Sequence, residues 1–176
     1  MEIKSRGIIV SSKKFELHKY MVDVLSKMGR WRGMYSAKTH PLILGSEGGF
    51  LWKGRSCSSL GNITFEVTKS SRVIAFWNDP LVVAAISCIC ASAAKFTPER
   101  IESYRDYNKF LECIRNINNS NYLEKLFEWE IYLMGEYFGQ EIELSSLDIN
   151  GLKIHCKKTI EISTKERNDF IKLYGN

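Results

Sequence analysis

Asn78-Asp79-Pro80, followed by LVVAAISCICASAAKF over residues 81–96, is the stretch of sequence that decides the fold. Asp79 offers a side-chain acceptor for the free amides at a helix start, and Pro80 suits the first turn. The residues that follow are apolar nearly all round, which is typical of a fully buried helix. The apolar part is about 14 residues long, short of the roughly 20 that cross a bilayer. We therefore expect a core helix and no transmembrane segment.

Further helices are expected on the carboxy-terminal side of this stretch. Thr97-Pro98-Glu99 has the N-cap, proline and acid of a helix start, and that helix should end within residues 116–121. A third helix should begin at Tyr122 and loosen at Gly135 and Gly139. The sequence thus predicts a helical middle region.

The carboxy-terminal part predicts a hairpin and a last helix. Asn150-Gly151 is a strong turn signal between β-rich residues 141–147 and 152–162. Ser163-Thr164-Lys165-Glu166 fits a capping box, so a short helix should carry Phe170, Ile171 and Tyr174 onto the body.

The amino-terminal part predicts mainly strands. Residues 3–11 are β-rich, whereas the apolar residues of 15–28 follow helical spacing until Gly29. Residues 30–77 hold short β-rich pieces divided by glycines, which indicates an antiparallel meander with strands at 42–44, 50–53, 63–68 and 73–77. Strands and helices do not alternate, so we expect one compact α+β domain over residues 1–176, an antiparallel sheet packed against several helices.

Composition and charge narrow the class of protein. The chain is 44% hydrophobic and 26% charged, as ordinary globular proteins are, and its net charge is +5. Residues 1–78 carry 13 Lys/Arg against 5 Asp/Glu, whereas residues 79–176 carry 12 against 15. This polarity suits a polyanionic partner, either nucleic acid or an anionic membrane surface, and equally suits contact between copies of the chain.

Targeting and cysteine patterns indicate a reducing compartment. The start, MEIKSR, has no apolar run behind its charges, so a secretory signal is not expected. The five cysteines form neither a CxxC pair nor an even set. We expect reduced thiols in a cytoplasmic protein that is not secreted.

Candidate catalytic and metal-binding residues do not form a known constellation. His18, His40 and His155 lie far apart without metal-ligand spacing, and His155 and Cys156 would point to opposite faces of a strand. Residues 45–49 are glycine-rich but lack the GxxxxGK[ST] pattern, so a turn is the better interpretation. We expect no catalytic residue, no metal, no cofactor and no small-molecule substrate.

An enzymatic alternative rests on two short stretches. Trp52-Lys53-Gly54-Arg55-Ser56 and Glu128-Trp129-Glu130 resemble the Arg, Ser-rich strand and Glu-x-Glu pattern of NAD-dependent ADP-ribosyltransferases. That enzyme would need a pocket joining Arg55, Ser56 and Glu130. On a helix, however, positions 128 and 130 do not share a face.

The best candidate for a binding surface is Arg30-Trp31-Arg32-Gly33-Met34-Tyr35, which interleaves cations with aromatics in an expected loop. Such a composition stacks on bases while neutralising phosphate, or lies at a lipid headgroup layer. Trp31 as a core residue and the cations as scattered solubilising charge stay open as alternatives. The candidate polyanion-binding residues are Lys13, Lys14, Arg30, Trp31, Arg32, Lys53, Arg55, Lys69 and Arg72.

A family resemblance lies in the core stretch and its flanks. Phe65-Glu66-Val67-Thr68 before the alanine-rich residues 81–94, and Leu147-Asp148-Ile149-Asn150-Gly151-Leu152-Lys153-Ile154 before Thr159-Ile160-Glu161-Ile162, resemble the rhabdovirus matrix protein. The proline-based PPxY and PTAP motifs of animal members are absent, so the resemblance is to a short, plant-infecting type.

The resemblance implies a nonenzymatic viral structural protein of the virion and host cytoplasm. Such a protein self-associates, condenses ribonucleoprotein through nucleoprotein or RNA contacts, and binds the anionic inner leaflet of a membrane. A small nucleic-acid-binding regulator is the remaining alternative.

Overall fold

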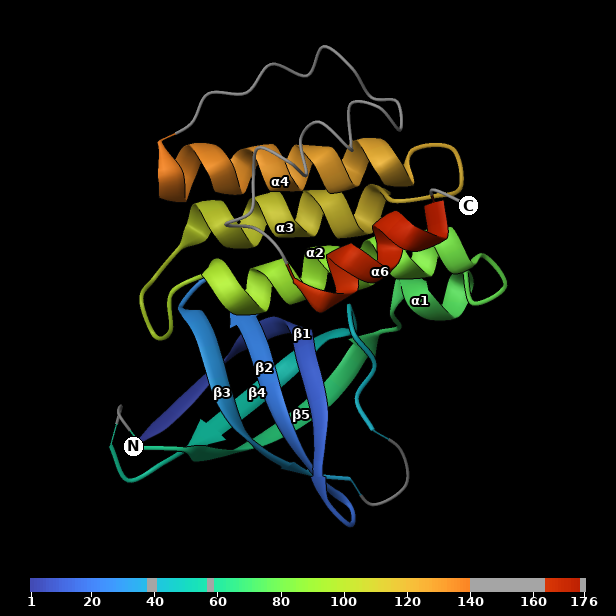
Figure 1. Cartoon of the computed structure of the whole chain (residues 1–176). Coiled ribbons are helices and arrows are strands. Elements are labelled where there is room, and N and C mark those ends of the chain that lie inside the picture. Colours follow the sequence, from blue (N-terminus) through green and yellow to red (C-terminus); the bar gives the residue numbers. More distant parts are fainter. Residues whose placement is uncertain (38–40, 57–58, 140–163, 175–176) are drawn as a thin grey trace.

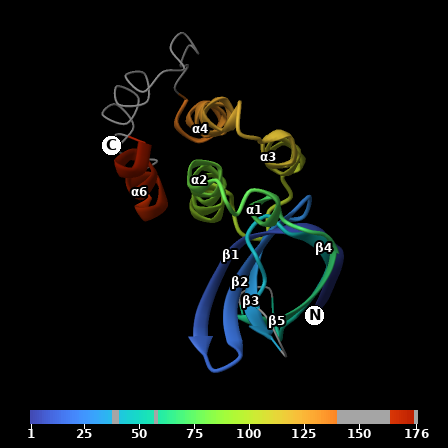
Figure 2. The ribbon, with the colours of Figure 1, turned by 90° about the vertical axis from the view of Figure 1, so that its right-hand side faces the viewer.

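The computed structural model describes residues 1–37, 41–56, 59–139 and 164–174. A closed β-barrel forms one layer, and helices stacked on one side of the barrel form the other (Figures 1 and 2). The coarse α+β expectation is therefore confirmed, but the sheet closes on itself.

The barrel has five strands in the described residues, in the order β1-β2-β3-β5-β4. Neighbouring strands are antiparallel except β3 and β5, which run parallel where Gly33 faces Gly61. A five-stranded Greek-key barrel of this kind is the OB-fold. The strands are β1 (Glu2–Glu16), β2 (Lys19–Ser26), β3 (Gly29–Ser36), β4 (Glu47–Lys53) and β5 (Gly61–Lys69).

Two irregularities in β1 redirect side chains. The pairing with β2 shifts between Ile9 and Ser11, which makes Val10 the extra residue and places it, like Ile8, in the core of the helical layer. It shifts again between Lys14 and Glu16, which leaves Phe15 unpaired and 60% exposed. Bulges commonly re-aim a side chain in this way.

The barrel has its own hydrophobic core. Trp31 and Trp52 lie in contact inside it, with ring centroids 5.2 Å apart, and Trp52 Nε1 donates to the Arg32 carbonyl at 2.9 Å. Trp31 is only 3% exposed, so its interpretation as a core residue is confirmed. The other buried members are Ile9, Val22, Val24, Leu42, Phe50, Ile63 and Phe65.

The helical layer is built around α2, which lies between the barrel and the outer helices (Figure 2). The predicted start is confirmed, because the Asp79 carboxylate accepts from the Leu81 and Val82 amides at 3.2 Å. Fully burying each aliphatic side chain of α2 contributes about 1.5–3 kcal/mol. The helices are α1 (Arg72–Ala75), α2 (Pro80–Phe96), α3 (Tyr104–Asn116), α4 (Tyr122–Phe138) and α6 (Lys165–Tyr174).

The connection between α2 and α3 corrects one prediction. Thr97 caps the end of α2, and α3 begins only at Tyr104 with Ser103 as its N-cap. The intervening segment pairs with β3, since the Arg30 amide donates to Pro98 and the Arg100 amide donates back to Arg30. These hydrogen bonds with β3 therefore take the place of the helix that the sequence predicts at Thr97.

Four other amino-terminal predictions are wrong. Residues 15–28 form the β1–β2 turn and strand β2 rather than a helix, because β1 and β3 pair with β2 along its length. Residues 30–35 form strand β3 rather than a loop. Residues 42–44 form no strand, and residues 73–77 begin in helix α1, whose N-cap is Ser71.

Two of the helices predicted on the carboxy-terminal side are present in the structure. Helix α4 begins at Tyr122 and ends at Gly139, which has a left-handed φ of 63°. The terminal helix α6 is present, and the Thr164 hydroxyl accepts from the Arg167 amide at 3.1 Å. The hairpin predicted around Asn150-Gly151 lies outside the described residues.

Candidate functional site

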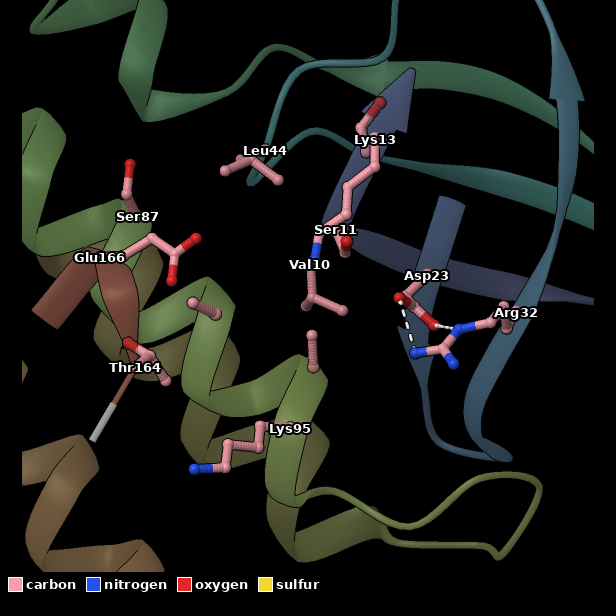
Figure 3. Close-up of a pocket in the computed structure, with 13 residues that line it drawn as sticks. Val10, Ser11, Lys13, Asp23, Arg32, Leu44, Ser87, Lys95, Thr164 and Glu166 are labelled. Carbon is pink, nitrogen blue, oxygen red and sulfur yellow. Dashed lines mark hydrogen bonds and ion pairs between the residues drawn. The ribbon is translucent and has the colours of Figure 1, made fainter. Parts of the chain in front are cut away.

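A groove of about 480 Å³ runs between the outer face of the barrel and the helical layer (Figure 3). Strands β1, β2 and β3 supply one wall, and helices α2 and α6 supply the other. We call it the interlayer groove. Its polar lining residues include Lys13, Asp23, Arg32, Ser87, Lys95 and Glu166.

Most of the α2 side chains that line the groove are small. Ser87, Ala91 and Ala94 follow one another at helical spacing and share with the longer Lys95 the face of α2 that lines the groove. The Ser87 hydroxyl donates back to the Val83 carbonyl at 2.9 Å, which leaves little side chain to fill the space.

Asp23 organises the cations on the barrel side of the groove. Its carboxylate accepts from Arg32 Nε at 2.8 Å and from Arg30 Nη1 at 2.9 Å. Both guanidinium groups also lie near Glu99, at 3.1 Å from Arg30 and 3.5 Å from Arg32. The hydrogen bond to Asp23 is the main reason why the pKa of Arg32 lies above its usual value.

Lys13 and Lys14 carry positive charges that lie outside the ion pairs of Asp23. Both side chains are exposed, and within the described ranges neither forms an ion pair. They extend the cationic lining of the groove along β1 toward the β1–β2 turn.

The turn that follows forms an exposed apolar tip. Phe15 is 60% exposed and Leu17 is 76% exposed, and this tip lies at the end of the barrel away from the helices (Figure 1). Lys19 pairs with Glu16 at 2.9 Å, but exposed pairs of this kind contribute little. We call residues 13–19 the hairpin tip.

The β4–β5 loop places two more of the predicted residues. Lys53 lies 2.6 Å from Glu2, and Arg55 is exposed. Arg100 donates from Nη2 to the Ser59 carbonyl at 2.9 Å, and its guanidinium lies 5.4 Å from the Trp52 ring. The α2–α3 connection thus braces this loop.

The nine predicted polyanion-binding residues do not form one patch. Lys13 and Arg32 line the interlayer groove and Lys14 adjoins it, whereas Arg30 and Trp31 are buried. Lys53 and Arg55 lie at the β4–β5 loop. Lys69 lies 3.8 Å from Glu47, and Arg72 donates to the Arg115 carbonyl, so these two belong to the junction between β5 and the helices.

Sequence reasoning missed Phe15, Leu17 and Lys95. The helix expected over residues 15–28 hid the first two, because it assigned Phe15 to a buried face. The signal that could have revealed them is the alternation of Val22, Asp23 and Val24, which fits a half-buried strand and makes the preceding residues a turn.

The residues of the enzymatic alternative lie apart. Glu130 is 1% exposed on α4, and Arg167 donates to both of its carboxylate oxygens. Glu128 accepts from Lys125 at 2.7 Å on the same helix. Arg55 lines a hollow at the β4–β5 loop, and neither Glu128 nor Glu130 lines that hollow.

The fold is an OB-type barrel with an attached helical layer, and no protein-family model matches the chain. The chain is similar to the DNA repair protein RecO of Jannaschia sp. (strain CCS1), with 23% identity over 158 residues. The match covers 86% of this chain and 64% of RecO, so the chain spans less than two thirds of that protein's length.

This similarity corrects the family prediction. The chain resembles a DNA repair protein, and nothing in the comparisons relates it to a rhabdovirus matrix protein. The predicted viral structural function is therefore wrong. The stretches that carried the resemblance were too short, and the whole of the carboxy-terminal one lies outside the described residues.

None of the helices in the described residues combines the length and the apolar character that crossing a membrane requires. In the same ranges, no three His, Cys, Asp or Glu side chains gather closely enough to hold a metal ion.

Proposed function

We propose that this chain is a nucleic-acid-binding module of the DNA repair type, and that it binds a single strand along the interlayer groove and the hairpin tip. The observation that carries the proposal is the position of this surface on the barrel. OB-folds bind oligonucleotides across the face of strands 2 and 3 and through the loops that follow strands 1 and 4. The groove and the tip occupy the first two of these places.

The chemistry of the surface supports the same function. Lys13 and Lys14 supply exposed cations for phosphate, and Phe15 supplies an exposed ring on which a base can stack. Asp23 is neutralised by Arg30 and Arg32, so its carboxylate does not repel a phosphate as a free one would. The similarity to a DNA repair protein agrees with this choice among the alternatives.

The test is equilibrium binding of a fluorescent single-stranded oligonucleotide at several salt concentrations. Each phosphate contact contributes about 0.7 to the slope of log K against log salt for single strands. Changing Lys13→Glu and Lys14→Glu together should weaken binding by about tenfold or more and lower the slope by about 1.4.

Lys4→Glu combined with Arg6→Glu is the matched control, because it changes the net charge by the same amount. Lys4 and Arg6 are exposed on the first half of β1 and line a separate hollow with Gly49 and Thr64. This control should change affinity much less than the Lys13→Glu/Lys14→Glu variant. Absence of binding by the unaltered protein would refute the proposal. Equal losses in both variants would show that binding follows net charge rather than this surface.

Other predicted partners need their own assays. RNA would meet the same cations and ring, so competition between RNA and DNA of equal length measures the preference. Self-association and binding to an anionic lipid surface stay predictions that the charge asymmetry supports. Sedimentation of the protein with anionic and neutral vesicles at low and high salt tests both in the same runs.

A further inference from the structure

The hairpin tip exposes two apolar side chains, whereas the interlayer groove has several charged lining residues. We propose that Phe15 and Leu17 form a wedge that enters the base stack where a duplex opens into a single strand. The inference rests on the proposed function and names its substrate class, a duplex with a single-stranded tail.

Phe15 and Leu17 are apolar side chains in solvent. They are 60% and 76% exposed and lie two residues apart at one turn, whereas Val22 and Val24, further along β2, are wholly buried. Single exposed apolar residues are ordinary, but two at the end of a hairpin form a compact apolar point. Apolar side chains of these types are the ones that proteins insert between base steps.

The backbone directs Phe15 outward. The register shift between Lys14 and Glu16 leaves Phe15 without a partner on β2, and Phe15 is exposed like Lys14 and Glu16 beside it. A β-bulge therefore lies where the aromatic ring enters solvent at the end of the hairpin.

The tip is also braced. His18 has a left-handed φ of 59°, and its carbonyl accepts from the Ala37 amide at 2.8 Å, which ties the turn to the end of β3. A wedge must keep its shape while it displaces a stacked base, and this cross-connection to a third strand restrains the turn.

Charge and spacing connect the tip to the groove. Lys13 lines the groove and lies two residues before Phe15, a distance of roughly 7 Å along a strand. A strand that leaves the groove at Lys13 therefore reaches the ring within about one nucleotide step. Lys14 lies beside the apolar point without an ion pair in the described residues, so it can neutralise a phosphate there, whereas Lys19 on the other side pairs with Glu16.

Energetics select a junction rather than an intact duplex. Opening a step inside a duplex breaks stacking on both sides, whereas one ring replaces stacking on one side only. At a junction, the last base pair is already stacked on one side only. A single aromatic ring can therefore replace the stacking that is lost when this base pair opens. A wedge of this size therefore works where the duplex already ends.

The experiment uses 2-aminopurine at the last base pair of a tailed duplex, with the same label in a single strand and in a blunt duplex. The unaltered protein should raise the fluorescence of the tailed duplex and bind it more tightly than the blunt duplex. The double variant Phe15→Ala/Leu17→Ala should lose the fluorescence rise and lower the preference for tailed duplex about fivefold or more. Its binding to single strands should fall by a smaller factor than its binding to tailed duplex, because the same ring also stacks a base of a single strand.

The control is Trp77→Ala, which removes a 73% exposed aromatic ring from a different part of the surface. Thermal melting checks that each variant folds. If Phe15→Ala/Leu17→Ala weakens single strands and tailed duplex equally, the tip is a plain stacking platform and the wedge is refuted. If the unaltered protein binds single strands without changing the junction fluorescence, only the wedge fails. If it binds no nucleic acid, the proposed function fails with it.

Discussion

Arg167 of α6 donates from Nε and Nη2 to the two carboxylate oxygens of Glu130 on α4, at 2.6 and 2.9 Å, and both side chains are almost wholly buried. This pair fastens the last helix to the helical layer. Helix α6 in turn brings Thr164 and Glu166 to the wall of the interlayer groove. The shape of the groove therefore depends on a contact inside the helical layer.

Removing one partner of the Glu130–Arg167 pair should destabilise the folded protein. Glu130→Ala leaves a buried guanidinium without its carboxylate and should lower the free energy of unfolding by about 3–5 kcal/mol. Urea unfolding followed by circular dichroism measures the change. Glu124→Ala, at an exposed site on the same helix, should change it by less than about 0.5 kcal/mol.

A second variant separates charge from packing. Glu130→Leu combined with Arg167→Met removes both charges while keeping apolar volume, so it should recover most of the stability lost by Glu130→Ala. A double variant as unstable as Glu130→Ala would show that the pair does more than balance two buried charges.

The Glu47–Arg115 pair should make the free energy of unfolding depend on pH in the acidic range. Hydrogen bonds from Arg115, at 2.9 and 2.5 Å, are the largest cause that lowers the pKa of Glu47. Because the folded pKa lies below the ordinary value of about 4.3, the stabilisation is complete above that value and is lost as pH falls through the folded pKa.

Glu47→Gln should therefore destabilise the protein at pH 7 and differ less from the unaltered protein as the solution is acidified. Unfolding free energies measured between pH 7 and pH 3 give this difference directly. Glu112→Gln, at an exposed position of α3, is the comparison variant. A constant difference for Glu47→Gln across the range would contradict the assignment.

Two glycines should respond to alanine in opposite directions. Gly29 has a φ of 89°, and an added Cβ would lie 2.3 Å from the Ile101 carbonyl oxygen, so Gly29→Ala should lower stability by about 2 kcal/mol or more. Gly135 lies within α4 with open space around it, so Gly135→Ala should raise stability by about 0.5–1 kcal/mol. Thermal melting of the two variants checks both signs.

Three thiols should be inert in the folded protein. Cys88, Cys90 and Cys113 are buried and free, and burial raises the pKa of Cys90 and of Cys113 to about 12. Alkylation at pH 8 followed by peptide mass spectrometry should label them only after unfolding. Rapid labelling of Cys113 in the native protein would show that α3 opens locally.

The candidate site was only partly predictable from sequence. Lys13 and Lys14 are exposed, and their role in binding a polyanion stays a prediction. Arg30, Trp31 and Arg32 looked like a surface loop, but Asp23 and Glu99 hold the two arginines and the barrel buries the tryptophan. Composition cannot reveal such partners, because they come from other strands and from the α2–α3 connection.

By itself, the sequence determined the features that depend on near neighbours. Asp79 and Pro80 start α2, and Gly139 ends α4, because helix hydrogen bonds and caps join residues within about four positions. Tertiary structure decided that residues 19–26 form a strand and that β3 meets β5 to close the barrel. Strand hydrogen bonds join residues far apart in the chain, so only the folded arrangement selects them.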